Sequence, residues 1–441
     1  MNIPTAVNLA FAAGIAASLF SGRRGGRGAG FRRFRRLYRG AAVILLNTVV
    51  LLLAINVLLL IPIAIKDSVN GGRVAGEYRH VDAGRWAALE RVYPGLSREE
   101  IQTLLNETYS PARAFAYEPF TEFRERPYAG RYVNVDAGGF RLTKGQGPWP
   151  PDREKYFNVF LFGGSTTFGF GVPDAETVAS HLQTLLSGRG PVKEVRVYNF
   201  GRGSYYSTQE RILFEKLVAA GFRPDVAVFI DGLNDSHHYD DRPSSAARVE
   251  SALEGRPAAV TNVLTKVPMV RAALAAGRWL GVGSSDEPAR EWAETPQDRA
   301  ACGDEAVLLS VVNRYVENKR ISEAVAAAYG VKTLFVWQPV AVYKYDQRYN
   351  LFAADDHPRK ACVEGAYPLM AKFAAQHPLG DNFLWGADIQ QGVPEPLYVD
   401  ALHYSGKMSE LFARSIADAL NERALLPFKG SQSPTATRGG V

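Results

Sequence analysis

The sequence predicts an α/β fold, a three-layer α/β/α sandwich with a central, mainly parallel sheet, preceded by an N-terminal transmembrane helix. From Tyr156 onward, short and almost continuously apolar runs alternate with longer helical runs. Such runs are typical of parallel strands that are covered by helices on both faces. The membrane helix is predicted from residues 41–65, an uncharged apolar stretch of 25 residues. This length exceeds the roughly 20 residues that a helix needs to cross a bilayer.

The charge distribution around residues 41–65 predicts the orientation of this helix. Eight arginines lie before the stretch, between Ser21 and Gly40. After it, a single lysine stands before Asp67, the first acidic residue of the chain. Positive residues stay on the cytoplasmic side of a membrane helix. We therefore expect residues 1–40 to be a cytoplasmic basic segment and everything after residue 66 to lie outside the cytoplasm, in the periplasm or extracellular space.

The basic character of the chain is local. The formal net charge is +6, but without those eight arginines the chain has 43 basic and 45 acidic residues. Because the arginines adjoin a membrane span, they favour anionic lipid headgroups over nucleic acid as their partner. Residues 4–20 form a second, shorter apolar stretch, which is either a weak additional span or an interfacial segment.

The exported part divides into three regions. Residues 66–150 are mixed and aromatic, with a hairpin expected around Gly138 and Gly139, and we interpret them as a membrane-proximal stalk and lead-in without chemistry of its own. Residues 151–426 form the main domain, with a helical subdomain inserted at about 236–308. Residues 427–441 have the composition of a disordered tail.

Four runs in the main domain are expected to be strands, and helices are expected between them. The stretch from Ser207 to Gly221 predicts a helix that Ser207 caps, with Glu210 completing a capping box. Ligands of such sheets bind at the carboxyl ends of the strands. The four predicted strands are 158–162, 195–200, 225–230 and 332–337.

Polar residues follow the first and third of these strands and recur near the end of the chain. Ser165 stands in the glycine-flanked run FGGSTTFG, and Asn234 follows the third strand in GLND. Asp400 and His403 are three residues apart in DALH, so one short loop can offer a carboxylate and an imidazole. A carboxylate that holds the Nδ1 side of an imidazole leaves Nε2 free to face a serine.

These runs, in this order, resemble the SGNH hydrolase family, also called GDSL-like esterases and lipases. FGGSTTFG resembles the family's first block, GLND the third and DALH the fifth, and the resemblance covers roughly residues 156–422. It implies a flavodoxin-like, three-layer sandwich and a serine hydrolase that needs no metal or organic cofactor. Ser165 is then the nucleophile, His403 the general base and Asp400 the residue that orients His403.

The resemblance also implies an oxyanion hole, made by the backbone N–H groups of Ser165 and Ser204 and the side-chain amide of Asn234. Here the chain departs from the family. Ser204 stands where the family has a glycine, with Gly203 just before it. A serine can supply the same backbone donor if the loop adopts a suitable conformation, so the position of the donor is left open.

Asp235 to His238 form a second DxxH run, and HHYDD has the residue types of a metal site. We do not expect His238 to be the catalytic base, because the family's histidine precedes the last helix. We do not expect a metal site either, because the side chains of adjacent histidines diverge. The two cysteines, Cys302 and Cys362, either pair across a loop insertion or remain separate thiols.

The leading functional hypothesis is an esterase that removes acyl groups, such as O-acetyl, from exported glycans or envelope lipids. An enzyme with the same triad can instead transfer the acyl group to a polysaccharide hydroxyl. The alternative from a different class is a tethered, non-catalytic protein that binds glycans or assists assembly. The sequence identifies neither the substrate nor the acyl chain.

Overall fold

The computed structural model describes residues 29–71, 83–109, 115–189, 193–243, 267–279, 296–355 and 360–426. The apolar stretch at 4–20, the tail at 427–441 and much of the predicted insertion lie outside the described residues. The chain forms two compact units, which we describe separately. One comprises residues 1–68 and 259–284, and the other comprises residues 69–258 and 285–441.

The first unit contains helix α2 (Ala29–Gly71), which includes the apolar stretch predicted at 41–65. Between Arg35 and Pro62 this helix is long and apolar enough to cross a membrane. Asn56, within that stretch, accepts a hydrogen bond of 3.0 Å at Oδ1 from the backbone N–H of Met269. Met269 belongs to α11 (Pro268–Trp279), a short helix that contacts α2 through this bond.

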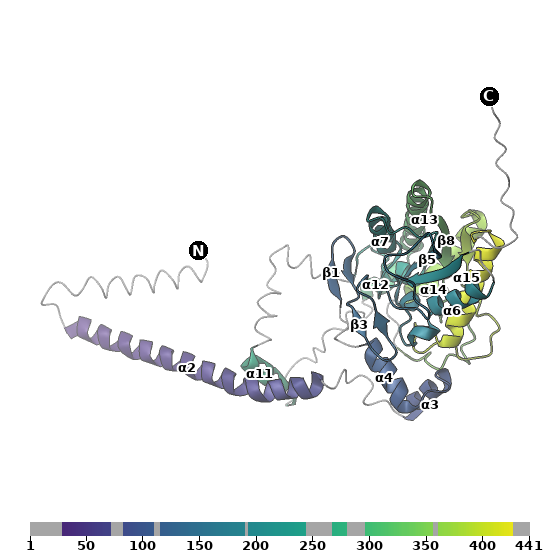
Figure 1. Ribbon diagram of the computed structural model, residues 1–441. Helices are drawn as coiled ribbons and strands as arrows, with labels where there is room; N and C mark the ends of the chain where they lie inside the picture. Colours follow the sequence, from purple (N-terminus) through teal and green to yellow (C-terminus); the bar gives the residue numbers. More distant parts are fainter. Residues whose placement is uncertain are drawn as a thin grey trace. The chain divides into compact units, whose positions relative to one another are not determined.

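The second unit is built on a five-stranded parallel sheet, which confirms the predicted fold class (Figure 1). The strand order is β6-β5-β7-β8-β9, and each neighbouring pair is parallel. Four strands agree with the predicted runs to within two residues, whereas β9 was not predicted because it consists of only three residues, all half-buried. The strands are β5 (Tyr156–Gly163), β6 (Glu194–Asn199), β7 (Val226–Asp231), β8 (Lys332–Trp337) and β9 (Phe383–Trp385).

The two faces of the sheet bury different kinds of side chain. On β5, Val159 and Leu161 face a largely aliphatic cluster under α6 (Val178–Gly188) and α15 (Gly406–Glu422). Alternate residues point to the opposite face, because the side-chain period of a strand is two. That face carries a row of stacked phenylalanines beneath α7 (Ser207–Ala219) and α13 (Glu305–Ala328). The row is Phe200, Phe162, Phe229 and Phe335, with successive ring centroids 5.8, 5.0 and 4.9 Å apart.

The predicted helix after β6 is confirmed as α7, which ends before Gly221, but its predicted capping box is wrong. Tyr206 occupies the N-cap, and Ser207 is the first helical residue. The hydroxyl of Ser207 donates instead to Oδ1 of Asp235 at 2.5 Å, and Glu210 is buried. Asp235 of the helix after β7 therefore takes the side chain of Ser207, and burial takes that of Glu210 away from the cap.

Residues 83–150 pack within the same unit as the sheet. Helix α3 (Ala83–Val92) precedes α4 (Arg98–Thr108), which begins with a capping box of Ser97 and Glu100. Four short strands follow, and the predicted turn at Gly138 and Gly139 is confirmed by the antiparallel bridge between Val135 and Arg141. Arg141 also bridges to Asn199 at the end of β6. The short strands are β1 (Ala116–Glu118), β2 (Glu122–Arg124), β3 (Tyr128–Ala129) and β4 (Asn134–Val135).

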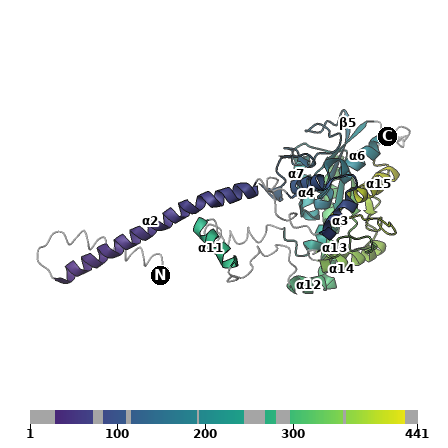
Figure 2. The ribbon, with the colours of Figure 1, turned by 90° about the horizontal axis from the view of Figure 1, so that it is seen from below.

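The described parts of the predicted insertion include helices, and one of these helices is linked covalently to α14 (Lys360–Gln376). Helix α8 (Leu233–His237) follows β7, and α12 (Pro296–Cys302) precedes α13. A disulfide joins Cys302 to Cys362 in α14, which settles the pairing that the sequence left open. Helix α14 lies beside α13 (Figure 2).

We expect Phe229→Ala to lower the free energy of unfolding by about 3–5 kcal/mol, because it removes a buried ring that stacks on both Phe162 and Phe335. Denaturant unfolding of the purified protein measures this loss. As a control, Ile321→Ala changes an exposed residue of α13 and should alter the free energy by less than about 1 kcal/mol. Equal losses for the two variants would contradict the assignment of the phenylalanine row to the core.

Candidate active site

The segments after β5, β6 and β7 carry Ser165, Ser204 and Asn234, and the loop before α15 carries Asp400 and His403. Ser165 begins α5 (Ser165–Phe168), directly after β5. Gly164 precedes it, and a Cβ atom at that position would lie only 2.2 Å from Nδ2 of Asn234. Only glycine therefore lets the side-chain amide of Asn234 approach the turn that carries Ser165.

Ser165, His403 and Asp400 form one chain of hydrogen bonds. Nε2 of His403 lies 2.9 Å from the hydroxyl oxygen of Ser165, and Nδ1 lies 2.7 Å from Oδ2 of Asp400. The backbone N–H groups of Leu402 and His403 donate to Oδ1 of Asp400, each at 2.8 Å. The carboxylate that orients His403 is thus itself held by the backbone of the same loop.

The electrostatic surroundings keep Asp400 ionised. Burial raises the pKa of this carboxyl, but the electrostatic interaction and the hydrogen bond with His403 oppose that effect, as do the two backbone N–H groups. The net result is a pKa well below the usual aspartate range. A carboxylate that is charged at neutral pH favours the tautomer of His403 with its proton on Nδ1, and that tautomer presents an unprotonated Nε2 to Ser165.

Potential donors for an oxyanion lie around Ser165. Asn234 donates one amide hydrogen from Nδ2 to the carbonyl oxygen of Tyr205 at 2.7 Å, which fixes the amide beside Gly164. Ser204 adopts a left-handed conformation with φ of 60°. Within the described parts of the chain, the backbone N–H groups of Ser165 and Ser204 donate to no protein acceptor.

A cavity of about 260 Å³ opens over these groups and has mostly apolar walls. Several of its residues were not predicted from the sequence. Phe170 follows the nucleophile turn closely, so its position was a usable signal, but nothing in the sequence indicated that residues before 150 would reach the site. The lining residues are Tyr109, Phe115, Ser165, Phe170, Gly203, Ser204, Asn234, His237, Leu402 and His403.

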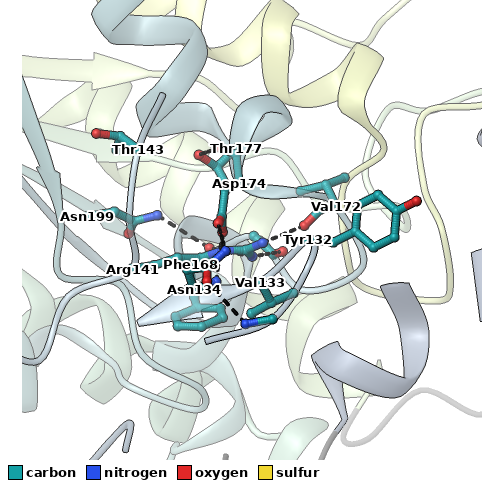
Figure 3. A network of polar contacts seen from close by, with 12 residues as sticks. Tyr132, Val133, Asn134, Arg141, Thr143, Phe168, Val172, Asp174, Thr177 and Asn199 are labelled. Carbon is teal, nitrogen blue, oxygen red and sulfur yellow. Dashed lines mark hydrogen bonds and ion pairs between the residues drawn. The ribbon is translucent and has the colours of Figure 1, made fainter. Parts of the chain in front are cut away.

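The loop after Ser165 is held by the buried guanidinium of Arg141 (Figure 3). Its Nε donates to Oδ1 of Asp174 at 2.9 Å, and Nη2 donates to the carbonyl of Val172 at 2.6 Å. Nη1 donates to the carbonyls of Phe168 and Gly169. One side chain from outside the predicted domain therefore binds three carbonyl groups of the loop that follows the serine.

In the second DxxH run, the ring nitrogens of His238 lie beside backbone carbonyl groups. Nδ1 of His238 lies 2.7 Å from the carbonyl of Arg242, and Nε2 lies 3.2 Å from the carbonyl of Ser204. The ring stacks on Tyr206 with centroids 4.7 Å apart. Among the described residues, no group of three or more acidic, histidine or cysteine side chains is arranged to hold a metal ion.

No protein-family model matches the sequence, and no curated protein matches it. Among solved structures, a carbohydrate acetylesterase family member from Sinorhizobium meliloti is 12% identical, with 60% of this chain and 98% of that chain covered and a TM-score of 0.33. A lipase/acylhydrolase from Enterococcus faecalis is 16% identical, with 63% and 99% covered and a TM-score of 0.33. A lipolytic protein of the G-D-S-L family from Veillonella parvula is 11% identical, with 60% and 98% covered and a TM-score of 0.31. Similarity at this level assigns no activity to the chain.

Arg141→Met should destabilise the fold by about 3–5 kcal/mol, because it leaves Asp174 and three carbonyl groups without their buried partner. Urea unfolding measures the effect. Arg153→Met is the matched control, since Arg153 is exposed and pairs with Asp225 at the surface, where such pairs contribute less than about 1 kcal/mol. A loss at Arg141 no larger than that at Arg153 would refute the role assigned to the network.

Proposed function

We propose that this chain is a serine esterase of the SGNH type that acts on short acyl esters, with Ser165, His403 and Asp400 as its catalytic triad. The observation that carries the proposal is the hydrogen-bonded chain from Ser165 through His403 to Asp400 beside the cavity. An alcohol, an imidazole and a carboxylate in this order are the groups that nucleophilic acyl transfer requires. The neighbouring N–H groups complete the requirement for an oxyanion site.

The proposed reaction proceeds in two steps. The hydroxyl oxygen of Ser165 attacks the ester carbonyl carbon while Nε2 of His403 takes the hydroxyl proton. The negative charge that develops on the carbonyl oxygen is stabilised by the N–H groups of Ser165 and Ser204 and the amide of Asn234. The C–O bond to the alcohol then breaks, and His403 returns the proton to the departing oxygen. Water, activated by His403, releases the acyl group from Ser165 in the same manner.

The cavity supports a short acyl group such as acetyl. Its volume of about 260 Å³ lies below the roughly 300–1,000 Å³ of pockets that enclose drug-sized ligands. Aromatic rings line it, including Phe115 and Phe170. An acetyl group fits within this space, and we propose that the alcohol part of the substrate carries most of the bulk.

We infer an extracytoplasmic location for the active site. The support comes from the arginines that precede the apolar stretch of α2 and from the disulfide between Cys302 and Cys362. Arginines favour the cytoplasmic side of a membrane helix, and disulfides persist in oxidising compartments. An acylated glycan or envelope lipid is the kind of bulky ester available there.

We expect a fluorophosphonate probe to label the full-length protein in detergent and to leave Ser165→Ala unlabelled, because only an activated serine reacts with the probe. Labelling is read by in-gel fluorescence and by mass spectrometry of the modified peptide. Ser310→Ala, which changes a serine in α13, is the control and should label like the wild type. Persistent labelling of Ser165→Ala, or no labelling of the wild type, would defeat the proposal.

Wild-type protein should turn over aryl acetate at least about tenfold faster than aryl octanoate in kcat/KM, and Phe115→Ala should narrow that ratio by opening the cavity wall. Phe120→Ala removes an exposed ring outside the lining and is the control. A preference for octanoate would rule out the short-acyl assignment.

Adding a polysaccharide acceptor distinguishes the two fates of the acyl group, since a hydrolase yields only free acid and a transferase leaves ester on the glycan.

A further inference from the structure

The loop that carries Asp400 and His403 has a contact from outside the predicted catalytic domain. The hydroxyl of Tyr109, at the C-cap of α4, donates to Oδ2 of Asp400 at 3.2 Å. Oδ1 of Asp400 already accepts the two backbone N–H groups of its own loop. Oδ2 is therefore shared between Nδ1 of His403 and the hydroxyl of Tyr109, and the two donors fix the plane of the carboxylate.

The ring of Tyr109 also supports the imidazole from the side. It packs edge-on against Phe170, with ring centroids 5.8 Å apart and an interplanar angle of 69°. Phe170 in turn stacks on His403, with centroids 5.3 Å apart and an angle of 20°. Tyr109 thus reaches both members of the Asp400–His403 pair, one through its hydroxyl and the other through Phe170.

Helix α4 holds Tyr109 rigidly. Ile101, Leu104 and Leu105 are buried in a cluster that also contains Phe168 of the nucleophile turn and Val399, which precedes Asp400. The carboxylate of Glu107 accepts the backbone N–H groups of residues 131–133 at 2.8–3.0 Å. The helix is consequently anchored on both sides, and its C-terminal end is fixed over the His403 loop.

The geometry points to Tyr109 as a positioning residue for Asp400, so that residues 83–109 are a necessary part of the active site. This inference rests on the proposed esterase function. A hydrogen bond to a charged group contributes enough to change an equilibrium by roughly tenfold or more. Losing it removes one of the two donors to Oδ2, which loosens the orientation of the carboxylate toward Nδ1 of His403 and reduces the fraction of enzyme with Nε2 aligned on Ser165.

The experiment compares Tyr109→Phe with the wild type, using full-length protein in detergent and an aryl acetate. We expect kcat to fall about tenfold, with KM and the unfolding midpoint unchanged, because the ring and its packing remain while the hydroxyl is lost. Tyr117→Phe, an exposed tyrosine of β1, is the matched control and should keep wild-type activity. A kcat for Tyr109→Phe within twofold of the wild type would overturn the inference.

A double-mutant cycle separates positioning of Asp400 from a general structural effect. In the Asp400→Asn background, Tyr109→Phe should change kcat by less than about twofold, since the carboxylate that it positions is absent. The same tenfold loss in both backgrounds would show that Tyr109 does not act through Asp400. If the wild type neither reacts with the fluorophosphonate probe nor hydrolyses ester, the esterase proposal itself fails. An active wild type with an unchanged kcat in Tyr109→Phe would instead refute only the role of Tyr109.

Discussion

The site depends on the buried guanidinium of Arg141, which binds the backbone of the loop after Ser165. Carbonyl groups in a loop of this kind cannot be satisfied by secondary structure, and buried carbonyls need donors. Arg141 supplies donors to Phe168, Gly169 and Val172 together, while Asp174 balances its charge. Since α5 is a single turn with few backbone hydrogen bonds of its own, this network adds the contacts that keep the serine turn in one conformation.

Residues of the segment 83–150, which includes Arg141, also contact two other loops of the site. Arg202, at the start of the loop after β6, pairs with Glu118 at 2.6 Å, and the N–H of Gly203 lies 3.4 Å from Oε1 of Glu125. Tyr109 contacts the loop of Asp400. Parallel strands bring their carboxyl ends to one edge, but the sheet does not provide hydrogen-bond partners for the loops beyond that edge. Here the partners come from the chain that precedes the sheet.

Sequence reasoning was strongest where chemistry and periodicity are local. Fully buried strands such as β5 and β7 produce apolar runs that are visible in the sequence, and the glycines around Ser165 mark a sharp turn. It was weakest where a residue's role depends on distant partners. Ser207 and Glu210 match a capping box, yet Asp235 and burial take them away from the cap. Tyr109 carries no local signal at all, because its hydroxyl meets Asp400 across 291 residues of chain.

Contacts from other segments hold Ser204 in a backbone conformation that serine does not favour by itself. A left-handed φ of 60° costs a serine about 1–2 kcal/mol, a penalty that glycine escapes. Strained conformations persist where the surroundings determine them. The neighbours of Ser204 do so, because Glu125 accepts from the preceding residue, His238 lies at the carbonyl of Ser204, and Asn234 donates to the following carbonyl. In the proposed mechanism, an N–H held in this way needs no rearrangement when the oxyanion forms, so the departure from glycine is compatible with a working oxyanion site.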